Sequence, residues 1–513
     1  MRSIFVVMLW LLCLCATAQL GLNKRYDVAN KGRPQTAFGI ELVGLDSFMV
    51  FTGSVDLDSI SPDTVEVYYA IYLQLIDGSG TLLAESKTRR PGHGIFLGWA
   101  NCCESMVPKG FVIGGSSKSY ADVNEARLMR MNAAGDTIWI RTYGGFGQSW
   151  VGQQVKTTSD GGFIICGDTD AIDYLDGFVL KTDSLGNELW RRTYGWNLLD
   201  DIVSIDMAPN NSYYTGGVRF RSTTNSDFWV QRLSSLGDTL WSVVWGSPFE
   251  EINAHLTTPT DGQPVVAGTW SYAAGTSSLK PYLAKLDSSD GSILWAQQYG
   301  PAIYGTAFFT AKEHPAGDLI ACGVSSESGD EQGLLLRTDS EGDSIWMRRY
   351  SYQDTAFDDG IGRFWDVLPT NDGGFIAAGM TFYSASQGLL PGYSQDSWVV
   401  KVDSMGCIVP GCDGVGIVEQ VTNLEGALKV YPNPVPANGQ LTVELFLPSS
   451  MHLSAPLRLV LTSMQGQLVK ELALPAQHDQ RVVLDVGGLA AGLYSVHVAD
   501  GGRWLTGARL VIE

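Results

Sequence analysis

Residues 177–195 read GFVLKTDSLGNELWRRTYG, and this stretch is the unit that the chain repeats. Its apolar run at 178–180 does not alternate, which is typical of a strand covered on both faces. The Asp-Ser-Leu-Gly sequence that follows predicts a turn, because an Asp carboxylate accepts backbone N–H groups and Gly tolerates a positive φ. A return strand carries Trp190 and Tyr194. The stretch therefore predicts a β-hairpin.

The tryptophan of this unit recurs at spacings of 51, 51, 54 and 51 residues, at Trp139, Trp190, Trp241, Trp295 and Trp346. A second kind of turn, which leads into an apolar run ending in Gly, occurs seven times and alternates with seven turns of the first kind. Each unit then has four strands in two hairpins. Four-stranded units of about 40 to 50 residues are typical of propeller blades. The sequence predicts an all-β chain with a seven-bladed β-propeller.

The repeated tryptophans could bind a ligand or pack between blades. One large aromatic residue on the return strand of each blade favours packing, because it buries a large area at each seam. The D-x-x-G-x-x-x-W spacing resembles repeats of the quinoprotein type, most closely at 287–295 (DSSDGSILW), where one extra residue precedes the Gly. This resemblance implies the fold alone, because no quinone, haem or metal motif accompanies it. We expect no cofactor and no metal site.

The start of the chain predicts how the ring closes. Residues 22–26 (LNKRY) match residues 346–350 (WMRRY), and after Asp403 the chain continues as CIVPGC without another such strand. We expect 22–26 to complete the seventh blade beside 398–402. This pairing would remove the free edges of the ring.

Composition and the N-terminus limit the function classes. The formal charge of -20, from 34 basic and 54 acidic residues, argues against a nucleic-acid or anionic-membrane surface. Residues 1–18 predict a signal peptide, with Arg2, an apolar run at 4–14 and an A-x-A site at 16–18. No other apolar stretch approaches membrane-spanning length, so we expect no transmembrane segment in the mature chain.

Export permits disulfides. Cys407 and Cys412 flank a Pro-Gly turn and are expected to close a small loop. The adjacent Cys102 and Cys103 have no explanation in the sequence.

The composition changes after Cys412. Residues 19–412 hold the propeller repeats, and 413–427 lack them and predict a linker. Residues 428–513 contain short alternating strands, which are typical of a small immunoglobulin-like β-sandwich.

Three motifs in this last segment carry a resemblance to a family: Tyr431-Pro432-Asn433-Pro434, a strand-turn-strand with MQGQ at 464–467, and GLYSV at 492–496 with Gly492 and Tyr494. Together they resemble the C-terminal sorting domain of type IX secretion cargo from Bacteroidetes-type bacteria. Many members end in a basic residue, whereas this chain ends in Val-Ile-Glu.

The resemblance implies export in two stages. A signal peptide delivers the chain to the periplasm, and an outer-membrane translocon then recognises the C-terminal domain. In the family that domain is commonly removed, and the cargo is released or attached to surface lipopolysaccharide. We therefore expect a secreted or cell-surface protein whose partner is the type IX translocon.

Catalytic motifs are not found: the sequence has no G-x-S-x-G, no H-E-x-x-H and no phosphate-binding Gly loop. Distant residues can converge in a fold, so an enzyme stays an alternative. The acidic run Asp168, Asp170, Asp173 and Asp176 lacks the spacing of an EF-hand loop. It is either a solvated loop or a Ca²⁺ site.

Three functions remain open. The chain is interpreted as a binding protein for a glycan or a protein ligand, and the alternatives are a glycan-active hydrolase or lyase and a structural envelope component. Convergent carboxylates in the central channel would favour the enzyme. Aromatic platforms would favour the binder, and a featureless face would favour the structural component.

The expected binding site lies on one face of the ring. Turns within the two hairpins of a blade are short and uniform, whereas the connections on the opposite face vary in length and carry aromatic and acidic residues. Function concentrates on variable loops held by a rigid scaffold. The candidate ligand-binding residues near the channel mouth are Trp150, Trp196, Trp270, Trp365, Asp200 and Asp359. The alternative is that these tryptophans plug the channel or pack beneath the loops.

Overall fold

The computed structural model describes residues 21–27, 34–61, 64–90, 93–106, 109–119, 123–145, 147–171, 175–196, 198–222, 225–273, 278–303, 305–327, 329–352, 361–385, 392–408, 420–422, 426–447, 453, 456–463, 468–500 and 503–513. These residues form strands and turns, with a short 3₁₀ helix at Pro209–Asn211. None of their helices could cross a membrane, since none is both long and apolar enough. The predicted signal peptide lies outside the described residues.

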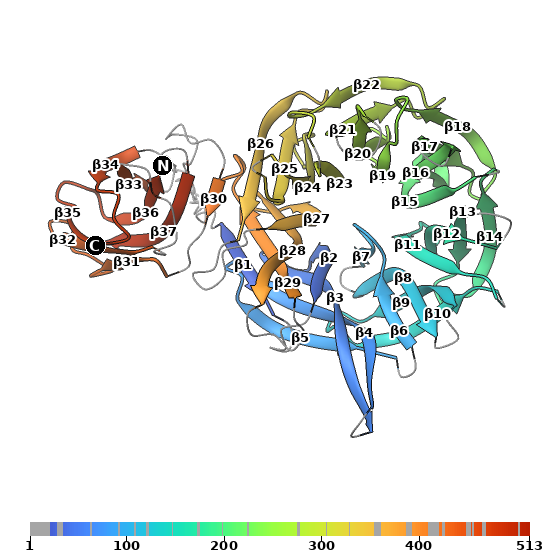
Figure 1. The fold of residues 1–513 in the computed structure, drawn as a ribbon, viewed down its shortest axis with the longest axis horizontal. Helices are drawn as coiled ribbons and strands as arrows, with labels where there is room; N and C mark the ends of the chain where they lie inside the picture. The colour runs from blue at the N-terminus through green and yellow to red at the C-terminus, as the bar shows by residue number, and fades with distance from the viewer. Residues whose placement is uncertain are drawn as a thin grey trace, which may run out of the picture.

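The strands of the propeller form seven sheets that surround a central opening (Figure 1). Blade 1 contains β2 (Gln35–Leu42), β3 (Ser47–Ser61), β4 (Thr64–Asp77) and β5 (Leu82–Thr88). Blade 2 contains β6 (His93–Leu97), β7 (Cys103–Ser105), β8 (Phe111–Ser119), β9 (Asn124–Met131) and β10 (Thr137–Tyr143). Blade 3 contains β11 (Trp150–Thr157), β12 (Phe163–Thr169), β13 (Asp176–Thr182) and β14 (Glu188–Tyr194). Blade 4 contains β15 (Asp200–Ala208), β16 (Ser212–Ser222), β17 (Asn225–Leu233) and β18 (Thr239–Trp245).

The remaining blades follow in chain order around the ring. Blade 5 contains β19 (Ile252–Thr257), β20 (Val265–Ser271), β21 (Leu279–Leu286) and β22 (Ile293–Gln298). Blade 6 contains β23 (Ala307–Glu313), β24 (Leu319–Ser325), β25 (Gln332–Thr338) and β26 (Ser344–Ser351). Blade 7 contains β27 (Gly362–Pro369), β28 (Phe375–Ala385), β29 (Gly392–Val402) and β1 (Leu22–Tyr26). In blade 2, β7 lies beside the opening; in the other blades the first strand does, and the last strand of each blade forms the rim (Figure 1).

The N-terminal strand β1 closes the ring. It pairs antiparallel with β29, with Leu22 opposite Lys401 and Arg25 opposite Trp398. The Trp398 indole donates a hydrogen bond of 2.6 Å to Asn23, and Arg25 forms an ion pair of 3.2 Å with Asp396. The prediction that 22–26 complete the seventh blade is confirmed.

The repeated tryptophan and tyrosine fasten each blade to the next. Gly186 of blade 3 has a φ of +78°, and a Cβ atom there would lie 2.9 Å from the Trp139 ring of blade 2. Tyr143 donates its hydroxyl hydrogen to the Gly186 carbonyl over 2.7 Å. Equivalent tyrosine bonds join Tyr26 to Gly80, Tyr194 to Gly237, Tyr299 to Gly342 and Tyr350 to Gly406. The prediction that the repeated tryptophans pack at the seams is confirmed.

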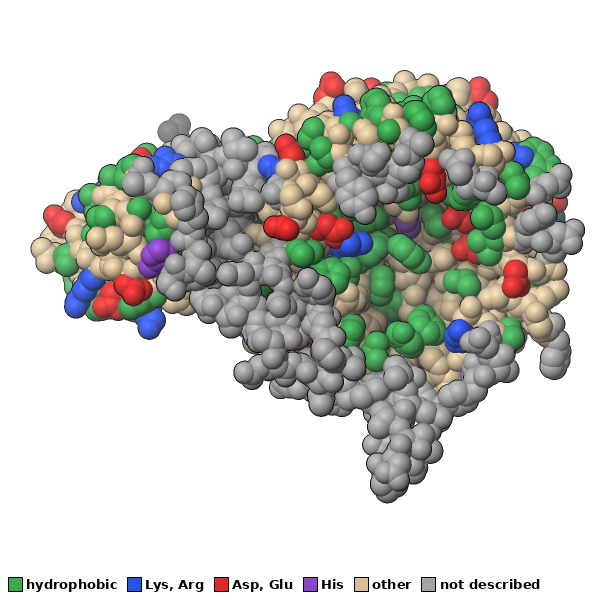
Figure 2. Space-filling view, viewed as in Figure 1, with side chains coloured by type: hydrophobic (Ala, Val, Ile, Leu, Met, Phe, Trp, Pro, Cys, Tyr) green, Lys and Arg blue, Asp and Glu red, His purple; other side chains and the backbone are tan. Residues whose placement is uncertain are grey.

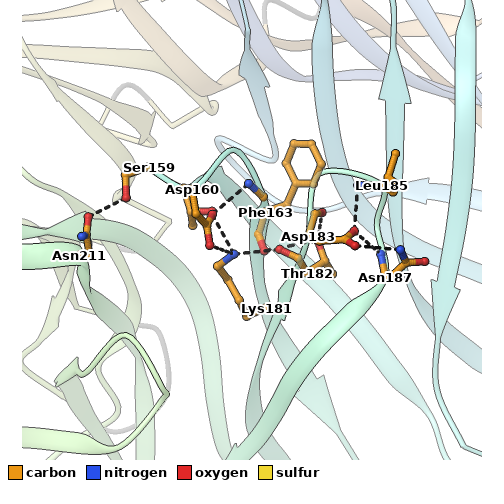
Figure 3. A network of polar contacts seen from close by, with 11 residues as sticks. Ser159, Asp160, Phe163, Lys181, Thr182, Asp183, Leu185, Asn187 and Asn211 are labelled. Carbon is orange, nitrogen blue, oxygen red and sulfur yellow. Dashed lines mark hydrogen bonds and ion pairs between the residues drawn. The ribbon is translucent and has the colours of Figure 1, made fainter.

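The two hairpin turns of blade 3 are held by their own side chains (Figure 3). Asp183 Oδ1 accepts the backbone N–H groups of Leu185 and Asn187, each over 2.8 Å. Beside it, Lys181 forms an ion pair of 2.9 Å with Asp160 in the other turn of the blade. We call this side of the ring the turn face and the opposite side the loop face.

The C-terminal residues form a β-sandwich beside the ring (Figure 1). One sheet contains β31 (Leu428–Tyr431), β32 (Gln440–Phe446) and β35 (Asp479–Asp485). The other contains β33 (Leu457–Ser463), β34 (Leu468–Leu474), β36 (Gly492–Asp500) and β37 (Arg503–Ile512). Leu441, Leu459, Val496 and Leu510 are buried in the core that the strands share. The predicted class, an all-β propeller followed by a small sandwich, is confirmed.

A short strand joins the two parts. Within the predicted linker, β30 (Gln420–Thr422) runs parallel to both β26 of blade 6 and β37 of the sandwich. Val460 and Ala499 of the sandwich are buried in one cluster with Tyr350 and Ile408 of the propeller. The sandwich therefore packs against the rim of the ring.

Candidate functional site

The loop face is hollowed at the centre of the ring, and hydrophobic side chains line this hollow (Figure 2). Trp365 is in contact with three other aromatic residues, each from a different blade. Its ring centroid lies 4.4 Å from that of Phe309, 5.3 Å from that of Trp99 and 5.7 Å from that of Phe38. Trp365 is 5% exposed, whereas Trp99 is 47% exposed. We call these four residues the aromatic plug.

β-Bulges aim three of the plug residues at the channel. In β2 the residues on either side of Phe38 pair with adjacent residues of β3, so that Phe38 itself has no partner in the ladder. The same shift leaves Phe309 out of the β23 ladder and Trp365 out of the β27 ladder. A bulge bends its strand and redirects the extra side chain. The repeat therefore places one side chain of each of these strands toward the axis.

Blade 2 contributes Trp99 through a larger excursion. Both β6 and β7 pair with β8, so residues 98–102 leave the ladder together. Asn101 has a φ of +59°, a conformation that Asn tolerates better than most residues. Its Oδ1 accepts a hydrogen bond of 2.9 Å from Lys312 of blade 6. We call residues 98–102 the crossing loop, because it joins blade 2 to blades 6 and 7 across the channel.

Charged residues of the first strands gather around Lys312. Its ammonium lies 3.4 Å from Asp366, whose other carboxylate oxygen accepts the Ile40 N–H over 3.1 Å. Burial raises the pKa of Glu41 to about 7, while Lys312 opposes the shift. Lys156 also belongs to this group and forms an ion pair of 3.8 Å with Asp206. Carboxylates and lysines thus converge on the channel.

An apolar pocket of about 370 Å³ lies between blades 1 and 2. Phe38 is part of both the pocket and the plug. The rings of Tyr69 and Phe96, also in the pocket, lie 4.4 Å apart. The lining includes few polar side chains, among them Thr36 and Gln395.

Trp196 and Asp200, two of the candidate ligand-binding residues, lie together on the loop face. Trp196 is 67% exposed, and the Arg219 guanidinium carbon lies 3.1 Å from its ring centroid. Asp200 accepts the backbone N–H of Trp196 over 2.6 Å. Burial raises the pKa of Asp200 and lowers the pKa of Arg219. The stacked pair holds the indole in place at the surface.

A pocket of about 360 Å³, lined by aromatic and polar side chains, adjoins Trp196. Its walls come from the rim of blade 3 and from β16, β17 and β18 of blade 4, and they include Trp229. The polar side chains that line it are Thr193, Arg219, Gln231, Thr239 and Ser242. We call this pocket, with Trp196, the Trp196 site.

The other predicted residues lie apart from this site. Trp150 is 6% exposed and packs 5.1 Å from Phe178, with the Arg191 guanidinium 4.4 Å above its ring. Trp270 is partly buried, 5.2 Å from Tyr282, and lines a separate groove. Asp359 lies outside the described residues.

The sequence did not single out Phe38, Trp99, Phe309 or Arg219. Phe309 and Trp365 stand the same number of residues before the glycines at 323 and 379, so an alignment of the first strands would have marked Phe309. Trp99 gives no such signal, because the crossing loop interrupts the repeat. Arg219 lies in β16 of blade 4, whereas Trp196 follows the last strand of blade 3. Their contact therefore depends on how the two blades pack together.

Three members of the acidic run lie in the described part of the chain, in separate settings. Asp168 and Asp176 are buried in strands, Asp170 accepts the Ser149 N–H over 2.5 Å, and Asp173 lies outside the described residues. Across the residues that are described, no group of three or more His, Cys, Asp or Glu side chains is arranged to hold a metal ion.

The cysteines differ in state. Cys407 is disulfide-bonded, and its expected partner Cys412 lies outside the described residues, so that pairing stays a prediction. Cys102, Cys103, Cys166 and Cys322 are all buried free thiols in the structure.

In the sandwich, the YPNP motif ties two strands together. Residues 431–434 are exposed, and Asn433 donates to the Arg509 carbonyl over 2.7 Å and accepts the Val511 N–H over 2.9 Å. Tyr494, in β36, is buried and donates to the Ala490 carbonyl over 2.8 Å. The motif residues at 464–467 lie outside the described part. The YPNP motif is therefore hydrogen-bonded to the backbone of the C-terminal strand β37.

Several solved structures are similar to this chain over about three quarters of its length. It is similar to a protein of unknown function from Dyadobacter fermentans (9% identity, covering 75% of this chain and 98% of that one, TM-score 0.39). It is also similar to the periplasmic gluconolactonase PpgL of Pseudomonas aeruginosa (10% identity, 81% and 95%, TM-score 0.39). A third similar structure is the WD40 domain of SCAP from fission yeast (10% identity, 75% and 98%, TM-score 0.36). A search of curated proteins gave no match.

The C-terminal part has a direct family match. The model of the secretion system C-terminal sorting domain matches residues 429–513, which is the sandwich described above. Such a tail implies handling by the secretion system. The chain is a cargo protein of type IX secretion, with a C-terminal sorting domain behind a seven-bladed β-propeller, and it is exported to the cell surface or the extracellular space.

Proposed function

We propose that the exported propeller binds a neutral glycan at the Trp196 site. The observation that carries this proposal is the 67% exposed Trp196 ring stacked on Arg219 beside a pocket with polar side chains in its walls. Large aromatic side chains are usually well buried, so an ordered and exposed indole points to a binding surface.

The geometry suits a sugar ring. Arg219 covers one face of the indole, and the C–H groups of a pyranose can pack on the other face. Because the Asp200 bond and the Arg219 stack already hold the Trp196 backbone and ring, binding loses little conformational entropy.

The pocket walls supply hydrogen-bonding groups for sugar hydroxyls. Thr193, Gln231, Thr239 and Ser242 offer both donors and acceptors. The formal charge of -20 disfavours a polyanionic ligand, which is why we propose a neutral one.

The test is a glycan array probed with the purified exported chain, followed by titration calorimetry with the best ligand. We expect W196A to weaken binding at least tenfold, about 1.4 kcal/mol, because the stacking surface is lost. The melting temperature should stay near that of the wild type, since the ring is exposed.

L199A is the matched control, because Leu199 is 43% exposed in the same loop and does not line the pocket. It should bind as the wild type does. An array without any binding, or a W196A variant with unchanged affinity, would refute the proposal.

A glycan-active hydrolase is the second candidate, since carboxylates converge in the channel. The pKa of about 7 at Glu41 would suit a general acid beside the Asp366 carboxylate. However, Asp366 is 1% exposed and paired with Lys312, so we favour binding. Hydrolysis of an array ligand that E41Q abolishes would support the enzyme instead.

A further inference from the structure

Two adjacent cysteines form the base of the crossing loop. Cys102 is its last residue, and Cys103 is the first residue of β7. In the structure both are free thiols whose Sγ atoms lie 3.5 Å apart, and both side chains are buried, at 0% and 2% exposure. They belong to an apolar cluster of blades 1 and 2 that includes Phe51 and Ile113.

The crossing loop, which ends at Cys102, makes contacts across the channel. Trp99 lies against Trp365 of blade 7, and Asn101 accepts its hydrogen bond from Lys312 of blade 6. The loop is also anchored on its own blade, because the Gly114 N–H donates to the Cys102 carbonyl over 2.8 Å. A constraint between Cys102 and Cys103 would therefore act on the aromatic plug.

The chain folds on a route where disulfides form. It is a cargo of type IX secretion, and Cys407 is already disulfide-bonded. Disulfides persist in exported proteins because these compartments lack the cytosolic reducing systems.

We propose that Cys102 and Cys103 form a vicinal disulfide in the exported protein, and that this bond locks the crossing loop across the channel. Each thiol gives up one hydrogen, and the two sulfurs form one bond. The oxidant is a disulfide donor, such as an oxidised dithiol protein of the envelope, and it is reduced to two thiols in the exchange. The product is an eight-membered ring that contains the peptide bond between the two residues.

The bond forms before the blade closes over it. Exchange requires a thiolate, and burial raises the pKa of the Cys103 thiol well above its usual value. In the folded chain the pair is consequently sealed from both oxidants and reductants.

The test is peptide mapping of the full exported chain, denatured and alkylated without reduction. Trypsin releases residues 90–109, a peptide in which Cys102 and Cys103 are the only cysteines. We expect this peptide to carry no alkyl group and to be lighter by two hydrogen atoms than the reduced peptide. Cys166 and Cys322 in the same digest serve as the control, because these free thiols have no adjacent cysteine in the sequence and should be fully alkylated.

A dynamic readout tests the effect on the loop. We expect hydrogen exchange over residues 98–101 to be roughly tenfold faster in C103S than in the wild type, because the constraint is gone. C166S, a substitution at a buried free thiol, should leave that exchange unchanged.

The proposal fails if residues 90–109 carry two alkyl groups, or if either cysteine is linked to another peptide. It also fails in part if the bond is present but C103S and the wild type exchange alike, since the bond then does not lock the loop.

Discussion

At the scale of single residues, the contacts between blades depend on a turn glycine that packs against a tryptophan of the preceding blade. Gly186 takes a φ of +78° inside the Asp-Ser-Leu-Gly turn, and the Trp139 ring of the preceding blade lies against it. Gly237 and Gly342 repeat this arrangement with Trp190 and Trp295. The turn glycine therefore serves both the hairpin and the contact between blades.

A pair of glycine substitutions separates these two roles. Gly161 has a similar φ of +80°, but a Cβ there would meet nothing within 4 Å. We expect G161A to lose about 1 to 2 kcal/mol from backbone strain, and G186A to lose roughly 1 to 3 kcal/mol more from the clash with Trp139. Denaturant unfolding of both variants measures the difference. Equal losses would mean that the seam does not depend on this contact.

We expect a buried histidine to make the folding stability of the protein decrease at acidic pH. His255, in β19, is 2% exposed, and burial lowers its pKa from 6.5 to about 4. The unfolded chain therefore binds more protons than the folded chain between these values, so this group lowers stability as the pH falls from 6.5 toward 4.

H255L removes that group. Between pH 7.5 and pH 5 we expect the wild type to lose about 2 kcal/mol more unfolding free energy than H255L. Urea unfolding at the two pH values provides the comparison. Parallel losses in the two proteins would show that His255 is not held neutral by burial.

At the scale of elements, the sequence predicts the hairpins but not the bulges. The D-x-x-G turns and the tryptophan period depend on local chemistry, and they predicted the seven blades and the return of β1 to blade 7. The bulges at Phe38, Phe309 and Trp365 depend on register between strands, which no local pattern carries.

The candidate site likewise contains residues that the sequence predicted and a residue that it did not. Trp196 and Asp200 lie four residues apart, and the sequence brought them into one hypothesis. Arg219, which stacks on the indole, comes from the next blade and appears only when the blades are packed together. The crossing loop interrupts the repeat of blade 2, so its place in the channel could not be predicted from the other blades.

Because Trp365 is at the centre of the aromatic plug, we expect W365A to be strongly destabilised. Trp365 is 5% exposed and stacked on Phe309, so its loss should leave a cavity and cost about 3 to 5 kcal/mol. The melting temperature should fall well below that of W196A. An unchanged melt in W365A would mean that the plug does not support the ring.

At the scale of the whole molecule, the plug and the loop face depend on a closed ring. Phe309 and Trp365 come from blades 6 and 7, whereas Phe38 and Trp99 come from blades 1 and 2. These blades lie on the two sides of the point where β1 meets β29. Because β1 pairs with the otherwise unpaired edge of β29, the chain start holds the scaffold of the binding face together.

Hydrogen exchange of residues 22–26 in the full exported chain tests this closure most directly. The account predicts that these amides are protected as strongly as those of β14, a rim strand that is likewise the last of its blade. Exchange at the rate of an unstructured peptide in 22–26, together with protected amides in β14, would contradict a ring closed by its own N-terminal strand.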